Sequence, residues 1–578
     1  MNFAESNRTY ARPWVRFYDK ETPKDLEYPE KTLYGVFCDT VASYPDTVAI
    51  DYMNEKITYR QLSVLVMQCA GALKAMQIGR GDRVTLCLPN IPQAVVAFYA
   101  VMAVGALANM IHPLSAGPEI EYYLNVSKSK CIFILDAFFH KLSGLRCPAL
   151  QFSVAAGAAD CLSLPMRLGF RFTKGRHIQK VRQSDAVLSW SRFLRQCKKP
   201  AEDGRIEAES GRYSDPAVIL YSGGTTGAQK GILLSHLNFN ALAAQTIAHG
   251  APTFAAGDTM LAVLPMFHGF GLGVCIHTCI YKGATIILVP QFHADSFAQL
   301  VIKKKPTFMA GVPTLYEALL RKNRLDKADF SKCKGIFSGG DMLPHDVKMR
   351  FDQLLKEKNG KVTLREGFGL TECVTASALT PMHVYRKGSV GIPYPDTFYK
   401  VVEPGTFREA APMEDGELCI HGPSVMIGYL DNQEETDRVL KLHPDGRIWL
   451  HTGDLGYMDA DGFIYFKLRI KRMIKCSGYS IYPSQVEAVL NAHEAVAMSC
   501  VIGVPDDYKM QKIKAYIVLK DAYKPSEELK KSIFAYCRDH LAAFSQPKEI
   551  EFRLSLPTTK VGKIAYTVLE QEAAAAKR

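Results

Sequence analysis

Short apolar runs alternate with longer amphipathic runs over most of this chain. DRVTLCLP at residues 82–89 and CIFILDA at 131–137 are short runs, whereas IPQAVVAFYAVMA at 91–103 and SHLNFNALAAQTIA at 235–248 are long ones. Short apolar runs are typical of strands that are buried on both faces, and the longer runs are typical of helices that cover them. The pattern therefore predicts an α/β fold with largely buried strands.

The pattern changes after about Arg469. QVEAVLNAHEAV and EELKKSIFAYCRDHL have helical periodicity there, whereas AMSCVIGVP and KIKAYIVLK are strand-like. We predict a large N-terminal domain over residues 1–469 and a separate, smaller α+β domain over residues 470–578, which has an ordinary domain size.

One uncharged stretch, from Val84 to Pro118, is long enough to be tested as a membrane span. Pro92 stands where a spanning helix would begin, and Gly105 interrupts the apolar run. A buried helix followed by a buried strand fits these residues better than a spanning helix does.

The composition is that of a soluble globular protein, because hydrophobic residues make up 48% of the 578 residues and charged residues 22%. There are 70 Lys and Arg against 58 Asp and Glu, which leaves a net charge of +12. This surplus favours acidic ligands such as nucleotides, or an anionic surface. It is too small to indicate nucleic acid as a partner.

The 15 cysteines are odd in number and lack a CxxC pair, which argues against a zinc ribbon and against a secreted disulfide framework. The N-terminus is polar and has no apolar segment of a signal peptide, so we expect a cytoplasmic protein. Cys275, His277 and Cys279 come nearest to a metal-ligand cluster in the sequence, but their apolar surroundings favour buried packing.

A basic insert lies between Asp160 and Asp185, where the sequence has six Lys or Arg and no acidic residue. Apolar residues such as Leu162, Phe170 and Phe172 are interleaved with these charges. Residues 161–184 are therefore a candidate for peripheral contact with the inner face of a membrane, and the alternative is the solvated face of an ordinary insertion.

The most informative segment is AVILYSGGTTGAQKGILLSHLNF, in which a buried strand at 217–220 leads into a glycine-rich loop. Glycines let backbone N–H groups approach an anion, hydroxyls add donors, and a lysine adds a positive charge. The loop is not a Walker A motif, because Gln229 precedes the lysine and Gly231 follows it. We predict a polyphosphate cradle, with a plain glycine-rich turn as the alternative. Its candidate residues are Ser222, Gly223, Gly224, Thr225, Thr226, Gly227 and Lys230.

This loop resembles the signature of the adenylate-forming superfamily, which includes acyl-CoA synthetases, firefly luciferase and the adenylation domains of peptide synthetases. Further motifs follow in the family's order, from TYRQLS at 58–63 to the GK pair at 562–563. The sequence departs from the family at Gln229, where Pro is usual, and at Gly223, where Ser is common. The resemblance implies ATP, Mg²⁺ and coenzyme A as ligands, and a mobile C-terminal domain.

The resemblance also implies contacts to the base and the phosphates. In REGFGLTE, Phe368 would hold adenine in place of the family's usual Tyr, Thr371 would contact the α-phosphate, and Glu372 would bind Mg²⁺. In FSGGDMLP, Gly339 and Gly340 would let the main chain approach the base.

Two more motifs imply contacts to the ribose and to the reacting phosphate. In HTGDLG, Asp454 would accept hydrogen bonds from both ribose hydroxyls, and Arg469 would assist it. In LPTTKVGKIAY, Lys563 would enter the active site and bridge the substrate carboxylate and the α-phosphate. A cation is needed there, because the transition state of adenylation gathers negative charge on phosphorus.

A motif that begins at Ile474, IKCSGYSIYPSQVE, resembles the loop that lines the pantetheine path in the second half-reaction. Lys475 would contact phosphate or adenine, and Gly478 would give the backbone space. Lys471 matches the hinge about which the small domain rotates in the family.

The motif LPMFHGFGLGVCIHTC resembles the junction of the nucleotide and acyl pockets. His268 would stabilise the substrate carboxylate, and the alternative is a packed histidine. Gly269, Gly271 and Gly273 recur at every second residue, so they either leave an apolar face open for an alkyl chain or form a helix-packing seam.

The N-terminal run that begins RPWVRFYDK resembles the start of bacterial long-chain fatty acid CoA ligases. We therefore predict an ATP-dependent acyl-CoA synthetase that converts a medium or long chain fatty acid to acyl-AMP and then to acyl-CoA. Two alternatives stay open, namely a fatty acyl-AMP ligase that passes the acyl group to a carrier protein and an aryl-acid CoA ligase.

Overall fold

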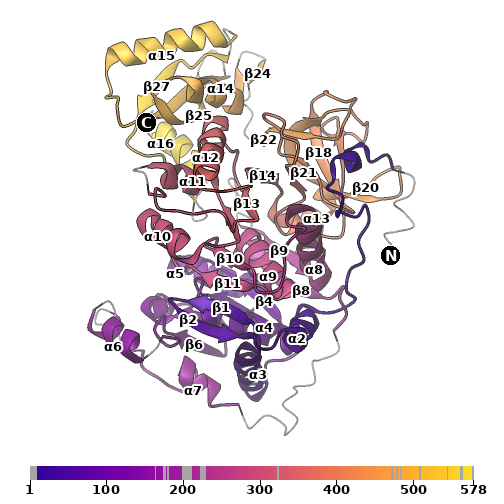
Figure 1. Cartoon of the computed structure of the whole chain (residues 1–578), viewed down its shortest axis with the longest axis vertical. Coiled ribbons are helices and arrows are strands. Elements are labelled where there is room, and N and C mark those ends of the chain that lie inside the picture. Colours follow the sequence, from indigo (N-terminus) through magenta and orange to yellow (C-terminus); the bar gives the residue numbers. More distant parts are fainter. Residues whose placement is uncertain are drawn as a thin grey trace.

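The computed structural model describes residues 10–162, 164–173, 178, 181–197, 211–221, 229–321, 324–469, 474–476, 479–481, 483–506, 510–542, 545–559 and 564–575. Two large sheets with their helices form the body of the molecule, a third sheet lies beside them, and a smaller unit lies at one end (Figure 1).

The first sheet carries the strand that leads into the glycine-rich loop. Its strands from β8 to β7 are parallel, whereas β9 and β19 add to one edge in the antiparallel sense. In the described part of the chain its order is β19 (Gly428–Tyr429), β9 (Gly231–Ser235), β8 (Pro216–Tyr221), β4 (Leu107–Met110), β3 (Arg83–Cys87), β5 (Cys131–Leu135), β6 (Phe152–Ala156) and β7 (Val187–Ser189).

The second sheet is parallel from β1 to β14 and ends in antiparallel strands on both sides. Among the described residues its order is β16 (Ile392–Pro393), β15 (Ala378–Leu379), β14 (Leu364–Phe368), β13 (Gly335–Ser338), β12 (Phe308–Gly311), β10 (Thr259–Ala262), β11 (Thr285–Leu288), β1 (Val48–Tyr52) and β2 (Glu55–Thr58). Its parallel strands are almost wholly buried, as the short apolar runs predict.

Helices between these two sheets form the main core. Helix α4 contacts β3 and β4 of the first sheet, α9 contacts β11 of the second, and α2 contacts both helices. The remaining helices of this part cover the outer faces or connect strands. The N-terminal helices are α2 (Leu33–Ser43), α3 (Tyr59–Ala75), α4 (Pro92–Ala103), α5 (Gly117–Ser127), α6 (Leu164–Phe172), α7 (Trp190–Leu194), α8 (His236–Gln245), α9 (Thr278–Lys282), α10 (Ala294–Lys304), α11 (Pro313–Leu320), α12 (His345–Glu357) and α13 (Gln433–Val439).

The uncharged stretch forms the buried helix α4 and then the buried strand β4, which confirms the prediction. Pro92 lies in the first turn of α4, where a proline is tolerated because the turn's first N–H groups lack intrahelical partners. Every residue of α4 is buried. In the described part of the chain, no helix combines the length and the hydropathy that crossing a bilayer requires.

The segment with Cys275, His277 and Cys279 is also packing, as expected. His277 is fully buried, and its ring nitrogens lie 2.9 Å from the Tyr99 hydroxyl and 2.9 Å from the Asn240 Oδ1 atom.

The third sheet is antiparallel and lies beside the first two. Its strands within the described residues are β17 (Phe398–Val402), β18 (Gly416–His421), β21 (Ile448–Met458), β20 (Leu440–Leu442) and β22 (Ile464–Arg469). The N-terminal segment packs on it through the short helix η2 (Pro13–Phe17), whose Trp14 is buried in the core of this sheet (Figure 1).

The C-terminal unit has a core of its own. Its described elements are β23 (Ile474–Cys476), β24 (Tyr479–Ile481), α14 (Pro483–Ala492), β25 (Val496–Asp506), β26 (Met510–Leu519), α15 (Glu527–His540), β27 (Glu549–Phe552) and α16 (Tyr566–Ala575). The fold class is confirmed, since a large α/β part with several sheets is followed by a small α+β part. The boundary between 469 and 470 stays a prediction.

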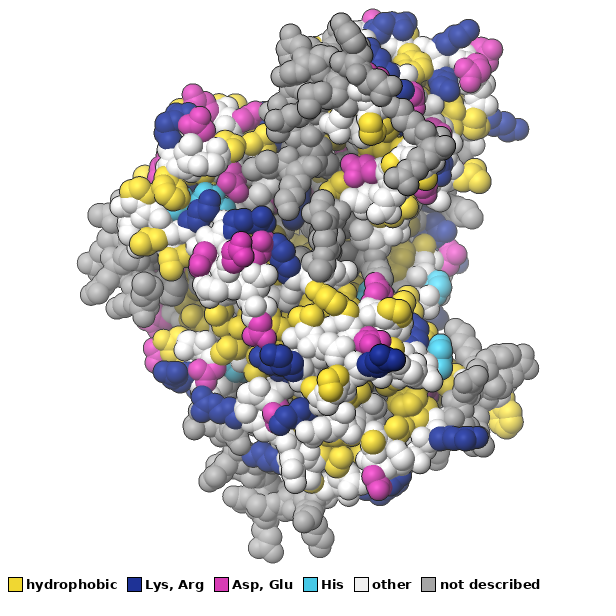
Figure 2. Space-filling view, turned by 180° about the vertical axis from the view of Figure 1, so that it is seen from behind, with side chains coloured by type: hydrophobic (Ala, Val, Ile, Leu, Met, Phe, Trp, Pro, Cys, Tyr) yellow, Lys and Arg dark blue, Asp and Glu magenta, His cyan; other side chains and the backbone are white. Residues whose placement is uncertain are grey.

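Charged side chains of both signs are interspersed on the face drawn in Figure 2. This distribution fits a modest net charge of +12.

Candidate active site

The residues predicted to hold the nucleotide come from the second and third sheets. Strand β14 ends at Phe368, and the 3₁₀ turn η8 (Thr371–Cys373) follows it. The Phe368 ring lies 5.6 Å from the ring of Phe466 on β22, measured between centroids. The predicted adenine residue therefore packs on the sheet that carries the predicted ribose residue.

Glu372 is held at both its backbone and its side chain. The Tyr429 hydroxyl donates to its Oε1 atom over 2.9 Å, and the Met426 N–H donates to its backbone carbonyl over 2.7 Å. Burial and the neighbouring Glu372 charge both raise the pKa of the Tyr429 phenol. Tyr429 therefore stays protonated and can keep donating to Glu372. Thr371, which directly precedes Glu372 in the chain, is buried.

Asp454 and Arg469 face each other across paired strands of the third sheet. They are register partners on β21 and β22, and the Arg469 Nε atom lies 3.1 Å from the Asp454 Oδ1 atom. The Asp454 side chain is buried, whereas Arg469 is partly exposed. The negative charges of Asp454 and Glu372 both raise the pKa of Arg469. The predicted ribose carboxylate, its arginine and the predicted metal ligand thus share one electrostatic neighbourhood.

Lys230 is the one member of the glycine-rich loop's candidate set that lies within the described residues. It forms an ion pair with Glu435 of α13, and its ammonium lies 5.2 Å from the centroid of the Tyr429 ring. Although burial opposes it, the contact with Lys230 lowers the pKa of Glu435. The other candidates, Ser222, Gly223, Gly224, Thr225, Thr226 and Gly227, lie outside the described residues.

The C-terminal unit reaches the same neighbourhood. Helix α14 contacts β22, and Tyr566 at the start of α16 contributes to the raised pKa of Arg469. Lys563 and Gly478 lie outside the described residues, as does the hinge candidate Lys471. Lys475 lies on β23 opposite Ser480 of β24.

His268 and Gly339 of the FSGG turn are linked through Phe270. The His268 Nδ1 atom accepts a hydrogen bond from the Phe270 N–H over 3.2 Å. A Cβ atom at Gly339 would lie 3.1 Å from the Phe270 ring, and Gly340 has a φ of +86°, which favours glycine. The acyl-pocket motif therefore packs directly against the predicted adenine turn.

The glycines of that motif form a packing seam, which was one of the two alternatives. A Cβ atom at Gly269 would lie 1.7 Å from the Val374 carbonyl oxygen, and one at Gly271 would lie 2.1 Å from the Pro265 carbonyl oxygen. At Gly273 the Leu242 side chain would be 2.6 Å away. Protein atoms therefore fill the space that an alkyl chain would need on these faces.

Two residues of the site were not found from the sequence. Tyr429 and Glu435 join Glu372 and Lys230 into one contact chain. Tyr429 sits on a two-residue strand that pairs with β9, far away along the chain, and Glu435 follows the Asn432 cap of a short helix. Neither position carries a local motif, so only the fold reveals them.

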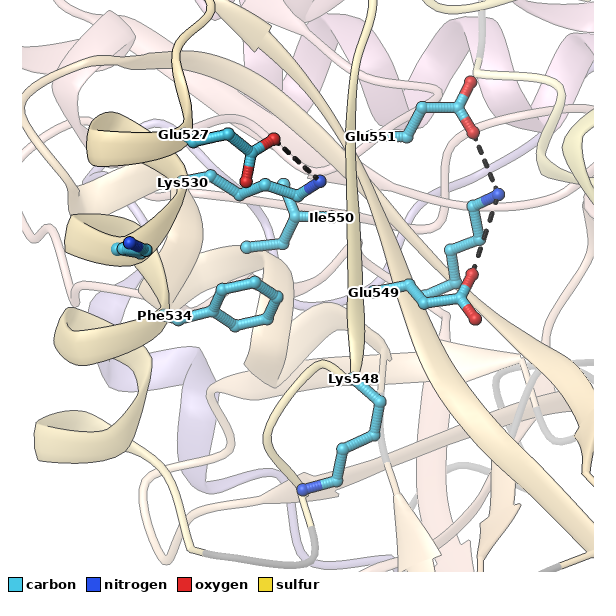
Figure 3. Close-up of a pocket in the computed structure, with 9 residues that line it drawn as sticks. Glu527, Lys530, Phe534, Lys548, Glu549, Ile550 and Glu551 are labelled. Carbon is cyan, nitrogen blue, oxygen red and sulfur yellow. Dashed lines mark ion pairs between the residues drawn. The ribbon is translucent and has the colours of Figure 1, made fainter.

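A cavity of about 460 Å³ lies apart from this group, between α15 and β27 of the C-terminal unit (Figure 3). Two of its four lysines are paired with carboxylates, because Lys514 contacts Glu551 at 2.8 Å and Lys530 contacts Glu527 at 3.7 Å. This cavity is lined by side chains of both charges, and none of the residues of the candidate nucleotide site lines it.

Known proteins resemble this chain over most of its length. The family model described as "AMP-binding enzyme" matches residues 37–430, and the model described as "AMP-binding enzyme C-terminal domain" matches residues 485–563. A long-chain-fatty-acid–CoA ligase of Bacillus subtilis strain 168 is 35% identical over 568 residues, which cover 97% of this chain and 98% of that protein. Its namesake from Salmonella typhimurium strain LT2 is 32% identical over 570 residues, with the same coverage.

Solved structures share the fold. The crystal structure of an anthranilate CoA ligase in complex with anthranoyl-AMP superimposes with a TM-score of 0.81 at 25% identity, over 96% of this chain and 99% of that one. The family models together span both predicted domains and most of the chain. The chain therefore belongs to the AMP-binding family of adenylate-forming enzymes.

Proposed function

We propose that this enzyme is an ATP-dependent acyl-CoA synthetase that acts on medium or long chain fatty acids. The observation that carries the proposal is the convergence of Glu372, Asp454 and Arg469 beside the C-terminal unit, whose helix α14 contacts β22. Relatives named long-chain-fatty-acid–CoA ligases, similar over almost the whole chain, support the choice of acid.

The reaction has two balanced steps. A carboxylate oxygen of the fatty acid attacks the α-phosphorus of ATP, and pyrophosphate leaves, which gives acyl-AMP. The sulfur of coenzyme A then attacks the acyl carbonyl carbon, and AMP leaves while the thiol proton is released to solvent. The first step gathers negative charge at phosphorus, so cations that surround it accelerate the reaction.

The residues at the site fit Mg²⁺. Carboxylate oxygens are ligands that Mg²⁺ prefers, and the Tyr429 hydroxyl would orient the Glu372 carboxylate as an outer-shell partner does. When bound, Mg²⁺ would offset the charge of the phosphate oxygens. Glu372 would hold the ion, and Tyr429 would keep the carboxylate in place.

We assign the ribose hydroxyls to Asp454, whose buried carboxylate is fixed by Arg469. Thr371 and the loop from Ser222 to Lys230 would bind the phosphates, and His268 would lie beside the carboxylate of the acid. Phe368, Gly339 and Gly340 would enclose the adenine.

Lys563 would bring the missing positive charge during adenylation. Tyr566, three positions further along the chain, lies in the neighbourhood of Arg469, which supports the approach of this segment to the nucleotide. In the second step the small domain would turn, so that Lys475 and Gly478 face the coenzyme A path instead.

The direct test is mass spectrometry of the products formed from a mixed pool of acids with ATP, Mg²⁺ and coenzyme A. We expect acyl-CoA from C8 to C18 fatty acids, and AMP in equal amount. Acyl-AMP without a thioester would favour a fatty acyl-AMP ligase that serves a carrier protein, and thioesters of aryl acids alone would favour an aryl-acid ligase. Either result would overturn the proposal.

The basic insert supports peripheral contact with an anionic membrane as a further part of the proposal. Its helix α6 projects from the body in Figure 1, and Phe172 and Met166 are exposed on it, with 75% and 38% of their surfaces accessible. Arg167, on the same helix, is exposed as well. Apolar and basic side chains on one short helix suit an anionic bilayer surface.

Sedimentation with vesicles tests this contact. We expect the protein to bind vesicles that contain anionic lipid and to lose most of this binding in Phe172→Asp. The fully exposed Leu554 provides a matched control, and Leu554→Asp should bind as the wild type does. If Phe172→Asp and Leu554→Asp bound the vesicles equally well, α6 would be excluded as the membrane contact.

A further inference from the structure

A cluster of two histidines and a cysteine, side chains of metal-ligating type, lies in the third sheet, whose strand β21 also carries Asp454. Cys419 of β18 and His451 of β21 are register partners on neighbouring strands, and His443 follows directly after β20. One ligand atom from each of the three lies within 4.8 Å of the others, and all three residues are buried. Among the described residues, no other group of this kind is found.

The ring of His451 is oriented as in known metal sites. Its Nδ1 atom lies 2.8 Å from Oε2 of Glu417, so the carboxylate accepts a hydrogen bond from Nδ1–H and leaves the lone pair of Nε2 for another partner. The Nε2 atom lies 2.9 Å from Nε2 of His443. Nitrogens bound to one tetrahedral Zn²⁺ lie about 3.3 Å apart, so a shift of a few tenths of an ångström would admit the ion.

The other nitrogen of His443, Nδ1, is buried and makes no hydrogen bond to the described residues. Within that part of the chain, the close pair of Nε2 atoms is therefore the only hydrogen-bond contact of this ring. Without a metal, one of the two nitrogens must donate to the other. A cation would be shared by both lone pairs.

The local charges balance a divalent ion. A bound Zn²⁺ would displace the proton of the Cys419 thiol, so the Cys419 thiolate and the Glu417 carboxylate would then supply two negative charges. Lys400 acts electrostatically on Cys419 and His443, but its ammonium is paired with Asp445 at 2.9 Å and with Glu409 at 3.4 Å. Lys441 also faces the cluster. One thiolate and two imidazoles are a ligand set that selects zinc over magnesium or calcium.

We propose that Cys419, His443 and His451 bind Zn²⁺, with water as the fourth ligand. The Phe407 ring lies 4.6 Å from the His443 ring and is 46% exposed, so it covers the site at the surface and marks the path of entry. The ion would tie the turn after β20 to β18 and β21. Glu417 extends the effect, because its Oε1 atom accepts a hydrogen bond from the Gly453 N–H, next to Asp454.

The test uses the full-length protein after removal of metal with a chelator. Titration with Zn²⁺ should give about one ion per chain, and Cys419→Ser and His443→Ala should lose this binding. Glu417→Gln, which changes the outer partner, should weaken affinity by about 10- to 100-fold. Cys333→Ser changes a buried cysteine elsewhere and should bind as the wild type does.

Co²⁺ gives a readout that does not depend on any variant. The wild type should develop thiolate-to-cobalt charge-transfer absorption and the visible bands of tetrahedral Co²⁺, and Zn²⁺ should remove both. Zn²⁺ should also raise the melting temperature of the wild type and of Cys333→Ser, but not of Cys419→Ser. Absence of the charge-transfer band in the wild type, or Zn²⁺ binding equal to wild type in Cys419→Ser, would overturn the site in favour of a metal-free histidine pair.

Discussion

Tyr429 connects the two charged residues that the sequence assigns to different parts of the nucleotide. Its hydroxyl holds Glu372, the proposed magnesium ligand, and its ring faces the ammonium of Lys230 in the glycine-rich loop. Because burial and Glu372 raise the pKa of its phenol, Tyr429 remains a donor at any working pH. It therefore acts as a positioning residue.

Tyr429→Phe removes this donor and keeps the ring. A hydrogen bond to a charged group contributes roughly 1.5–3 kcal/mol, so we expect adenylation to fall by about tenfold or more and the half-saturating Mg²⁺ concentration to rise. Pyrophosphate exchange at varied Mg²⁺ measures both. Tyr457→Phe, on a half-buried stacked pair with Tyr465, is the control. An unchanged Mg²⁺ dependence would refute the role of Tyr429.

Glu366 makes stability depend on pH. Burial raises its pKa from 4.5 to about 8, although the Leu343 N–H donates to its Oε1 atom. The folded state therefore holds a proton that the unfolded state releases near pH 4.5, and this stabilisation is lost as the pH rises from 4.5 to 8. In Glu366→Gln the melting temperature, relative to wild type, should rise between pH 5 and pH 8. If the difference in melting temperature between the variant and the wild type were the same at every pH, the raised pKa of Glu366 would be contradicted.

At the scale of secondary-structure elements, the π-helix η6 (Phe270–His277) and the turn η8 (Thr371–Cys373) meet where their backbones approach each other closely. Val374, which follows η8, has a φ of +62°, an unusual value for a β-branched residue. Its carbonyl oxygen occupies the space beside Gly269. The glycine thus allows a strained turn next to Thr371 and Glu372, where strain often marks a functional site.

Gly269→Ala should disturb this contact, because its Cβ would lie 1.7 Å from the Val374 carbonyl oxygen. We expect a loss of about 1–3 kcal/mol in the free energy of unfolding together with a loss of adenylation. A Cβ atom at Gly79 would have no other atom within 4 Å beyond its chain neighbours, so Gly79→Ala is the matched control. Urea unfolding and pyrophosphate exchange give the two readouts. If Gly269→Ala and Gly79→Ala behaved alike in both assays, the packing seam at Gly269 would be excluded.

The elements that the sequence predicts well are those whose signal is local. Pro92 and the uncharged run that follows predict α4, and the two glycine-rich motifs point to loops beside buried strands. Tyr429 and the pair of Cys419 and His451 depend on strand pairing between distant segments, and no spacing rule reveals them. Asp454 and Arg469 were found through the family resemblance. No local sequence pattern indicated that they are register partners on β21 and β22.

At the scale of the whole molecule, we propose that the two units contribute together to each of two half-reactions in turn. Lys563 belongs to the C-terminal unit, whereas Glu372, Asp454 and Arg469 belong to the large one. Each orientation of the small unit would serve one step, so a residue used in only one orientation should affect only that step.

Lys563→Ala tests this separation. Loss of one charge stabiliser typically lowers a rate by about 10² to 10³, so we expect such a decrease in the formation of acyl-AMP. Thioester formation from synthetic acyl-AMP and coenzyme A should be largely retained. Lys560→Ala, on the same segment, serves as the control. Equal damage to both steps would count against the rotation.

The pairing of β9 with β19 has a consequence for synthesis on the ribosome. Strand β9 follows the glycine-rich loop, but its outer partner is the short strand that contains Tyr429, which is made much later. Until then the nascent chain exposes an unpaired edge, to which another strand can add. Chains truncated before Gly428 should therefore aggregate and require chaperones, and slow translation beyond β9 should reduce the yield of native enzyme.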